Sequence, residues 1–540
     1  MKKLLLLLIV IYQVSIVNSS AQVTLYITDF GAVGDGATVN TLAIQSAIDS
    51  CNEAGGGEVV VPTGTFLSGT IFLKSNVLLN LTDSALLKGS GNPNDYPEIE
   101  SQVHGMADDY RKRSLIYAEN ENHIGITGEG TLDGNSLSTQ FILNSSLRPF
   151  GVRFISCVNV RYENITMKNS PFWMMHNLNC DTLLISGLTI INAGVGNNDG
   201  INADGCRYVR IHDCTVESFD DAMVLKTTSM SEMHDVEIYN CSFSSLARVI
   251  KIGTETIGDI SNVHIYDCIV TEGGLGQPGE IGINIASIDG AHIDSVLIEN
   301  ITVSGVQVPI VVRLGNSNRQ YIDTLPPLPT GSFENIWLKN ISGEGLNNLP
   351  CHITGIPDHS LENVHLENIS FTVPGGSAAI DSNYVVPENI ADRPEFDLLG
   401  NTLPSYGIYF RHVNGLTLDS VCIIPIQPDA RAMIWIDDVQ NLTAENVCEE
   451  IVEDVEEISA QNNLKLIYDV QNNLLEVGIT NPDQRFWNGE LSIYGIDGRL
   501  LLSEELNSSE AFYTCAVFPF AWKFESVKGN LRTGKVWIKK

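Results

Sequence analysis

MHDVEIYNCSF, at residues Met233–Phe243, contains the pattern that decides the fold, because close copies of it recur along the chain. The other copies are VNVRYENITM at Val158–Met167, SNVHIYDCIV at Ser261–Val270, DSVLIENITV at Asp294–Val303, ENIWLKNISG at Glu334–Gly343 and ENVHLENISF at Glu362–Phe371. Apolar and polar residues alternate in every copy, as in a short strand that buries one of its sides. The pattern therefore predicts stacked strands that share one interior.

The spacing of the copies indicates a solenoid. Their apolar anchors are Val160, Leu183, Val209, Val236, Val263, Val296, Ile336, Val364, Leu416 and Leu442. From Leu183 to Val263 the successive anchors lie 26, 27 and 27 residues apart, which matches one coil of a β solenoid. The wider gaps, from Val296 to Ile336 and from Val364 to Leu416, are then expected to hold loops inserted between coils.

Asparagines recur at one position of the coil, between two β-branched stretches where the chain must turn. They are Asn164, Asn240, Asn300, Asn340 and Asn368. Asparagine tolerates the left-handed backbone conformation that such a corner needs. Several of them also match the N-x-[ST] glycosylation pattern, among them Asn164, Asn300, Asn340 and Asn368. We favour the corner interpretation, because it accounts for all five residues at once.

The two ends of the chain differ from the repeat. Residues 1–21 have the layout of a secretory signal peptide, with two lysines, an apolar run and small residues. Residues Asn40–Asn52 have helical apolar spacing and precede the glycine run Gly55–Gly57, which predicts a helix that covers the open end of the solenoid. Near Glu450 the anchors stop, so we expect a solenoid at 22–450 and a small C-terminal β domain at 451–540.

Composition narrows the classes of function. A formal net charge of −34 excludes a nucleic-acid partner, because a phosphate backbone would be repelled. The same charge means that an acidic polysaccharide would need a local cationic strip. No later segment has the apolar length of a membrane-spanning helix, so we do not expect an integral membrane protein. The signal-peptide layout predicts export to the cell surface, the outside of the cell or the periplasm, and we expect the protein to be a monomer. The 11 cysteines show no metal-binding spacing, so we expect no metal, mostly buried thiols, and at most one or two oxidised pairs.

Three aspartates are the candidates for chemistry. Asp199 lies in NNDG and is followed 21 residues later by the pair Asp220-Asp221, close to one coil further along the chain. Adjacent coils lie about 4.8 Å apart, so these carboxyl groups should share one groove. Because Asp220 and Asp221 cannot both point outward from a regular strand, a strand end or bulge is expected there. An isolated Asp-Asp pair in an acidic protein is more often a solvated turn.

Five motifs give the chain a resemblance to the polygalacturonase family of pectin-degrading glycoside hydrolases. They are TDFGAVGDG at Thr28–Gly36, GEGTLDG at Gly128–Gly134, RPFGVRF at Arg148–Phe154, NSPFWMMH at Asn169–His176 and FDDAMVLK at Phe219–Lys226. The resemblance implies an all-β, right-handed parallel β-helix, no cofactor, an acidic plant polysaccharide as partner, and inversion at the anomeric carbon. It also implies that Asp220 is the general acid and that Asp199 and Asp221 position and deprotonate the attacking water.

Two segments depart from the family pattern. The usual Gly-His-Gly is replaced at Ala247–Thr254, which contains no histidine, and the usual Arg-Ile-Lys is replaced by Asn284-Ile285-Ala286. The candidates for substrate binding are therefore Lys226, Arg248, Lys251, Asn197 and His176, with Trp173 and Arg313 as further candidates. For each of them, an ion pair or a packing role is the alternative interpretation.

Other functions remain open at this point. A β-helix lyase would cleave uronans by elimination with calcium and a basic residue, and a noncatalytic sugar-binding solenoid would use the aspartates only as ladder residues. The tail, with LSIYGIDGRLLL, resembles the C-terminal sorting domains of type IX secretion, although a carbohydrate-binding or purely structural β module would give a similar pattern.

Overall fold

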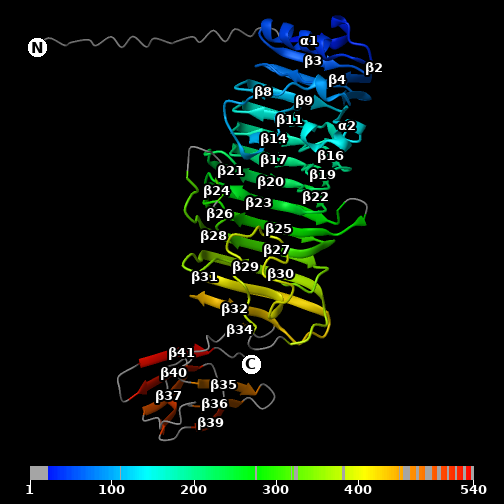
Figure 1. Cartoon of the computed structure of the whole chain (residues 1–540). Coiled ribbons are helices and arrows are strands. Elements are labelled where there is room, and N and C mark those ends of the chain that lie inside the picture. The colour runs from blue at the N-terminus through cyan, green and yellow to red at the C-terminus, as the bar shows by residue number, and fades with distance from the viewer. Residues whose placement is uncertain are drawn as a thin grey trace, which may run out of the picture.

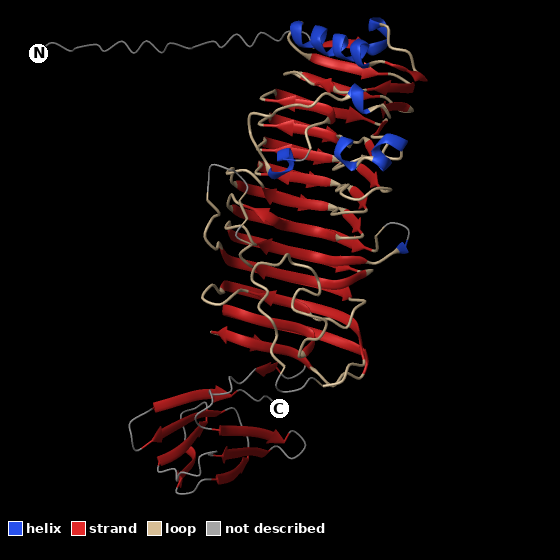
Figure 2. Cartoon of the chain, in the orientation of Figure 1, coloured by secondary structure: helices blue, strands red, loops and turns tan. Residues whose placement is uncertain are grey.

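Parallel strands wind into one long solenoid with three faces (Figure 1). The computed structural model describes residues 22–448 except 110, 274–275, 318, 321–325 and 380–383, together with the backbone of the strands from Ile451 onward. Strands dominate, as Figure 2 shows, and the solenoid strands form a single sheet of parallel pairings. The predicted right-handed parallel β-helix is confirmed.

The first face consists of β5 (Ile71–Phe72), β8 (Ser114–Glu119), β11 (Phe150–Ile155), β14 (Met175–Leu178), β17 (Ile201–Asp204), β20 (Met223–Thr227), β23 (Arg248–Thr256), β25 (Gly279–Ser287), β27 (Val306–Leu314), β29 (Cys351–Thr354), β32 (Ala432–Gln440), β34 (Ile451–Glu453) and the start of β31 (Ser405–Gln427). The second face consists of β1 (Val23–Tyr26), β3 (Gly57–Val61), β6 (Val77–Leu81), β9 (Asn122–Gly128), β12 (Val158–Glu163), β15 (Asp181–Ser186), β18 (Arg207–His212), β21 (Met233–Tyr239) and the first parts of β24 (Ile260–Thr271), β26 (His292–Val303), β28 (Ser332–Glu344) and β30 (Leu361–Gly375). The third face consists of β2 (Asp35–Val39), β4 (Gly64–Ser68), β7 (Ala85–Gly89), β10 (Thr131–Asp133), β13 (Thr166–Lys168), β16 (Thr189–Asn192), β19 (Thr215–Ser218), β22 (Ser242–Ser245) and the later parts of the long strands, while β33 (Thr443–Glu445) pairs with the middle of β31 and continues the second face.

The coils stack in register, as the anchors predict. Leu183 pairs with Val209, Val209 with Val236, and Val236 with Val263. The wide gaps are confirmed as insertions, because Val296 pairs directly with Ile336 and Val364 with Leu416. The inward side chains of all three faces form one continuous apolar core.

The corner asparagines adopt the predicted backbone conformation. All five have φ between 51° and 61°, in the left-handed region. Their side chains also bond from coil to coil: Asn368 Nδ2 donates to Asn340 Oδ1, and Asn340 Nδ2 donates to Asn300 Oδ1, each at 2.9 Å. The corners at Asn340 and Asn368 are therefore each linked to the corner of the coil before them.

The helix at the amino end is also confirmed. Helix α1 (Thr41–Glu53) lies across that end of the solenoid, and its buried side chains Ile44, Ala47, Ile48 and Cys51 join the core (Figure 1). The remaining short helices are α2 (Thr139–Leu143), η1 (Ile27–Phe30), η2 (Pro93–Asp95), η3 (Met106–Asp109) and η4 (Ser145–Leu147). Among the described residues, no helix combines the length and the apolar character needed to cross a membrane.

Beyond the solenoid, seven strands form two antiparallel sheets. They are β35 (Asn463–Asp469), β36 (Leu474–Thr480) and β39 (Glu510–Ala516) in one sheet, and β37 (Gly489–Gly495), β38 (Leu500–Leu506), β40 (Phe520–Ser526) and β41 (Leu531–Val536) in the other. The signal peptide at 1–21 lies outside the described residues, as does most of the region around the proposed boundary near Glu450. Both assignments stay predictions.

Most cysteines are buried thiols in the described part of the chain. Eight are free and buried, while Cys422 and Cys448, which lie on successive coils, form a disulfide. The disulfide agrees with the expectation that one or two pairs oxidise, and Cys515 lies among residues whose side chains are not described.

The asparagine ladder is expected to contribute measurably to stability. Asn340→Ala removes two side-chain hydrogen bonds and replaces asparagine by a residue that tolerates the left-handed region less well, which should cost about 1–2 kcal/mol. Asn340→Gly loses the same bonds but tolerates the backbone angle, so its melting temperature in calorimetry should lie between those of Asn340→Ala and the wild type. Equal melting temperatures for the two variants would show that the backbone angle is unimportant.

Candidate functional site

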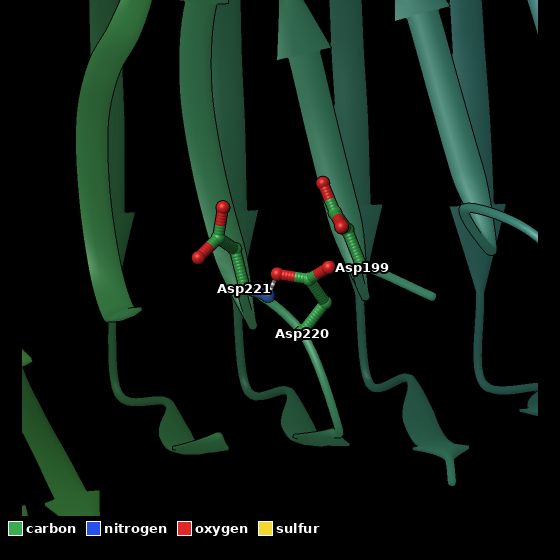
Figure 3. A group of neighbouring side chains, drawn as sticks. All are labelled: Asp199, Asp220 and Asp221. Atoms are coloured by element: carbon green, nitrogen blue, oxygen red, sulfur yellow. Dashed lines mark hydrogen bonds between the residues drawn. The ribbon is translucent and has the colours of Figure 1, made fainter. Parts of the chain in front are cut away.

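The three aspartates meet at the start of two neighbouring strands of the first face. Asp199 precedes β17, and the Asp220-Asp221 pair precedes β20, so the strand end expected for the pair is present. The Gly200 N–H donates to the carbonyl oxygen of Asp221 at 2.9 Å and fixes the two coils in register. One oxygen from each of the three carboxylates lies within 4.8 Å of the others. Figure 3 shows the three side chains gathered at the ends of neighbouring strands.

Local hydrogen bonds hold the turns that present these carboxylates. The Asn192 side-chain amide donates to the carbonyl oxygens of Asn198 at 2.6 Å and Asp199 at 3.1 Å. The Ser218 hydroxyl donates to the Asp220 carbonyl oxygen at 2.6 Å. Both turns are therefore anchored to β16 and β19 of the third face, which makes the position of the aspartates a property of the coil.

Asp199 and Asp221 are buried and lie against lysines. Lys251 Nζ donates to Asp221 Oδ2 at 2.6 Å. Lys226 Nζ lies 3.8 Å from Asp199 Oδ2 and 4.0 Å from Glu255 Oε2, and it sits 3.7 Å from the centre of the Trp173 ring. The three carboxylates are close enough to bind one cation together, but two ammonium groups already balance part of their charge.

Asp220 is half-buried, while Asp199 and Asp221 are buried. Its Oδ2 accepts hydrogen bonds from the Asn197 backbone N–H at 3.1 Å and from Asn197 Nδ2 at 3.3 Å. Its Oδ1 accepts from the Asp221 N–H at 3.1 Å. Asp220 is therefore the carboxyl group of the three with the greatest access to a ligand.

Crowding of like charges makes ionisation costly. Burial, and then the charge of Asp220, raise the pKa of Asp199 well above its usual range, although Lys226 opposes the shift. Burial and the charge of Asp221 likewise raise the pKa of Asp220. The group therefore tends to keep a proton at a pH where ordinary aspartates have lost theirs, which is the property required of a general acid.

The other predicted residues separate into two groups. Asn197, Lys226 and Lys251 contact the aspartates directly. Arg248 contacts Asp221 only through its backbone N–H, at 3.2 Å, while its guanidinium group pairs with Glu280 at 3.2 Å and with Glu395. Lys226, Lys251 and Arg248 thus form the local cationic strip expected beside an acidic site, but each has an acidic partner.

His176 and Arg313 contact protein groups instead of the aspartates. His176 is fully buried, with Nε2 3.1 Å from Asp204 Oδ2 and Nδ1 accepting from Arg153 Nε at 3.3 Å. Arg313 is also fully buried and donates to the carbonyl oxygens of Glu388 at 2.6 Å and Asn389 at 3.1 Å. Both are placed as packing residues, with no surface for a ligand to reach.

Sequence reasoning missed three acids around the site: Glu255, Glu280 and Glu395. Lys251 and Glu255 are four residues apart on β23, a spacing that places both side chains on the same side of a strand. Glu255 could therefore have been predicted from the sequence. Glu395 lies 147 residues after Arg248 in a segment without a repeat, and no spacing signal connects them.

Comparisons with known proteins agree with this geometry. The model of the family described as "Glycosyl hydrolases family 28" matches residues 51–389, which include all three aspartates. A probable polygalacturonase of Vitis vinifera is 35% identical over 214 residues, which are 37% of this chain and 44% of the relative. An exo-poly-alpha-D-galacturonosidase of Dickeya chrysanthemi is 42% identical over 117 residues, which are 20% of this chain and 19% of the relative.

A solved structure supports the fold. The family 28 exopolygalacturonase of Yersinia enterocolitica superposes with a TM-score of 0.57 at 19% identity, over 78% of each chain. This likeness concerns the fold alone. The chain spans less than half the length of each of these two curated relatives.

Replacing Asp199 by asparagine should stabilise the protein at neutral pH. Because the folded pKa of Asp199 is raised above the unfolded value of about 3.9, the folded state binds more protons, and the free energy of unfolding falls as pH rises above about 4. Asp199→Asn should melt like the wild type near pH 4 and about 1–3 °C higher at pH 7.

Asp83→Asn, at an exposed turn, is the matched control for this measurement. If the difference in melting temperature between Asp199→Asn and the wild type stays the same from pH 4 to 7, the raised pKa of Asp199 would be contradicted.

Proposed function

Because the chain belongs to glycosyl hydrolases family 28, we propose that it is a secreted glycoside hydrolase that cleaves a pectin-type polysaccharide. The observation that carries the proposal is the convergence of three carboxylates within 4.8 Å at the start of neighbouring strands. Hydrolysis of a glycosidic bond needs one carboxyl group to protonate the leaving oxygen and another to activate water. The site offers a carboxyl group for each task.

Asp220 is assigned as the general acid. It is the most accessible of the three aspartates, and its raised pKa favours the protonated form that an acid needs. After it gives its proton to the leaving sugar, the N–H groups of Asn197 and Asp221 stabilise the carboxylate that forms.

Asp199 and Asp221 are assigned to the attacking water. Carboxylate oxygens within 4.8 Å of each other can both bond to one water molecule at ordinary hydrogen-bond lengths of about 2.7 Å. Lys226 and Lys251, behind them, balance the charge that develops when the water loses a proton. This separation is shorter than the roughly 6.5–9.5 Å common in inverting enzymes, so the assignment of inversion rests on the family resemblance.

The substrate assignment rests on the matched polygalacturonases. Export through the signal peptide, a sorting role for the C-terminal strands and action as a monomer complete the proposal. Export fits a substrate that is too large to enter a cell.

The acid role is tested by Asp220→Asn. Loss of the proton donor should lower kcat on polygalacturonate by about 10²–10⁴-fold while binding persists. Reducing-end release measures kcat, and calorimetry with an oligogalacturonate measures binding; Asp83→Asn serves as the control. A variant that keeps full activity would sink the assignment, and a wild type that binds oligogalacturonate without cleaving it would favour the noncatalytic solenoid.

The products distinguish hydrolysis from elimination. We expect saturated reducing ends whose first-formed anomer is inverted, seen by proton NMR early in the reaction. EDTA should leave the rate within about twofold, because the lysines already balance part of the charge of the carboxylates. Unsaturated products absorbing in the ultraviolet, together with inhibition by EDTA, would instead identify a lyase; a retained anomer would overturn only the stereochemistry.

A further inference from the structure

The cations beside the aspartates are already engaged, which leaves open how an acidic sugar is held. Lys251 pairs with Asp221 at 2.6 Å, Lys226 lies between Asp199 and Glu255, and Arg248 pairs with Glu280 and Glu395. A uronate carboxylate arriving at any of these cations would have to displace a protein carboxylate, and that exchange gains little.

The next coil offers no replacement. Asn284 pairs in register with Lys251 and is fully buried, and Ile285 and Ala286 follow it on β25. The positions where the family resemblance places an arginine and a lysine are therefore neutral here. A cation that recognises an acidic sugar must come from another part of the chain.

A long segment from the β30–β31 insertion reaches the same face. The Arg411 guanidinium donates to the Val386 carbonyl oxygen at 2.8 Å, and Arg313 donates to the carbonyl oxygens of Glu388 and Asn389. The Asn316 N–H donates to the Ile390 carbonyl oxygen at 2.8 Å. These bonds tie the segment to β27 and β31, so it is held in place by buried side chains of the first face.

The segment then makes a tight turn at Arg393–Glu395. The Glu395 N–H donates to the Arg393 carbonyl oxygen at 2.8 Å in a tight turn around the buried Pro394. Glu395 pairs with Arg248, whose own backbone N–H contacts Asp221. Arg393 therefore lies one short turn from a residue that touches the coil of the catalytic group.

Arg393 differs from the other cations in being available. Its side chain is exposed, and within the described part of the chain it forms no ion pair. Its charge reaches the site: although burial acts in the opposite direction, Lys251, Lys226 and then the arginines Arg319 and Arg393 lower the pKa of Glu255 to about 2. Arg393 also lies beyond residue 389, where the match to the family model ends.

We propose that Arg393 binds the carboxylate of a uronate unit in the groove and so gives the enzyme its preference for acidic over esterified sugar. The proposal rests on the proposed function. A guanidinium group binds a carboxylate through two parallel N–H···O bonds, which a methyl ester cannot accept equally well. The anchoring of the segment through Arg248–Glu395 holds Arg393 in place before the substrate arrives, which lowers the entropy cost of binding.

The test compares Arg393→Gln with the wild type on trigalacturonate and on its methyl ester. KM for the acid should rise about tenfold with kcat within twofold, while KM for the ester stays unchanged. Arg393→Lys should restore part of the affinity, because the charge remains but the fork is lost. Arg161→Gln, on the second face, is the matched control and should behave like the wild type.

Calorimetric binding of trigalacturonate in an Asp220→Asn background separates this inference from the proposed function. If the wild type proves inactive but binds, a tenfold loss of affinity on adding Arg393→Gln still supports the assignment. Equal effects on acid and ester, no effect on either, or no binding by the wild type would each overturn it.

Discussion

In-register stacking of parallel coils is the constraint on which the rest of the structure depends. Hydrogen bonds such as Gly200 N–H to the Asp221 carbonyl oxygen lock each coil to the next, and the spacing of about 4.8 Å between strands sets the distance between side chains at equal positions. The corner asparagines hold the backbone in the same turn coil after coil. Because the register is kept, Asp199 and Asp221 lie side by side. A slip of one residue would turn one of them into the core.

Three carboxylates packed this closely repel one another, so nearby positive charges must offset the repulsion. The site has lysines beside the aspartates and a further acid beside one of the lysines. Lys226 and Lys251 contact two of the aspartates, and Glu255 in turn contacts Lys226. The raised pKa of Asp220 shows that the compensation is incomplete. A fully neutralised group would be more stable but would hold no proton to donate. The free energy that the fold loses by crowding these carboxylates is the same free energy that keeps an acid protonated at the site.

The sequence predicted those parts of the molecule that obey a local rule. The solenoid, the corner conformation of Asn340, the strand end at Asp220-Asp221 and the insertion between Val364 and Leu416 all follow from alternation, periodicity or backbone preference. The burial of His176 and Arg313 could not be predicted from the sequence, because the residues that contact them come from other coils and insertions. Pairing between Arg248 and Glu395 depends on where an irregular segment returns to the sheet, and no periodic pattern records that.

An acidic protein can act on an acidic polymer because most of its negative charges are too far from the binding groove to repel the polymer. Charges separated by more than about 8 Å are largely screened at physiological ionic strength, so most of the net charge of −34 has little influence within the groove. The electrostatic potential at a bound sugar is set mainly by the nearby charges: the aspartates, their lysines and the segment that carries Arg393. Insertions between coils can alter that balance without disturbing the register beneath them. A solenoid of this kind can therefore keep one catalytic arrangement while its loops change which sugar is accepted.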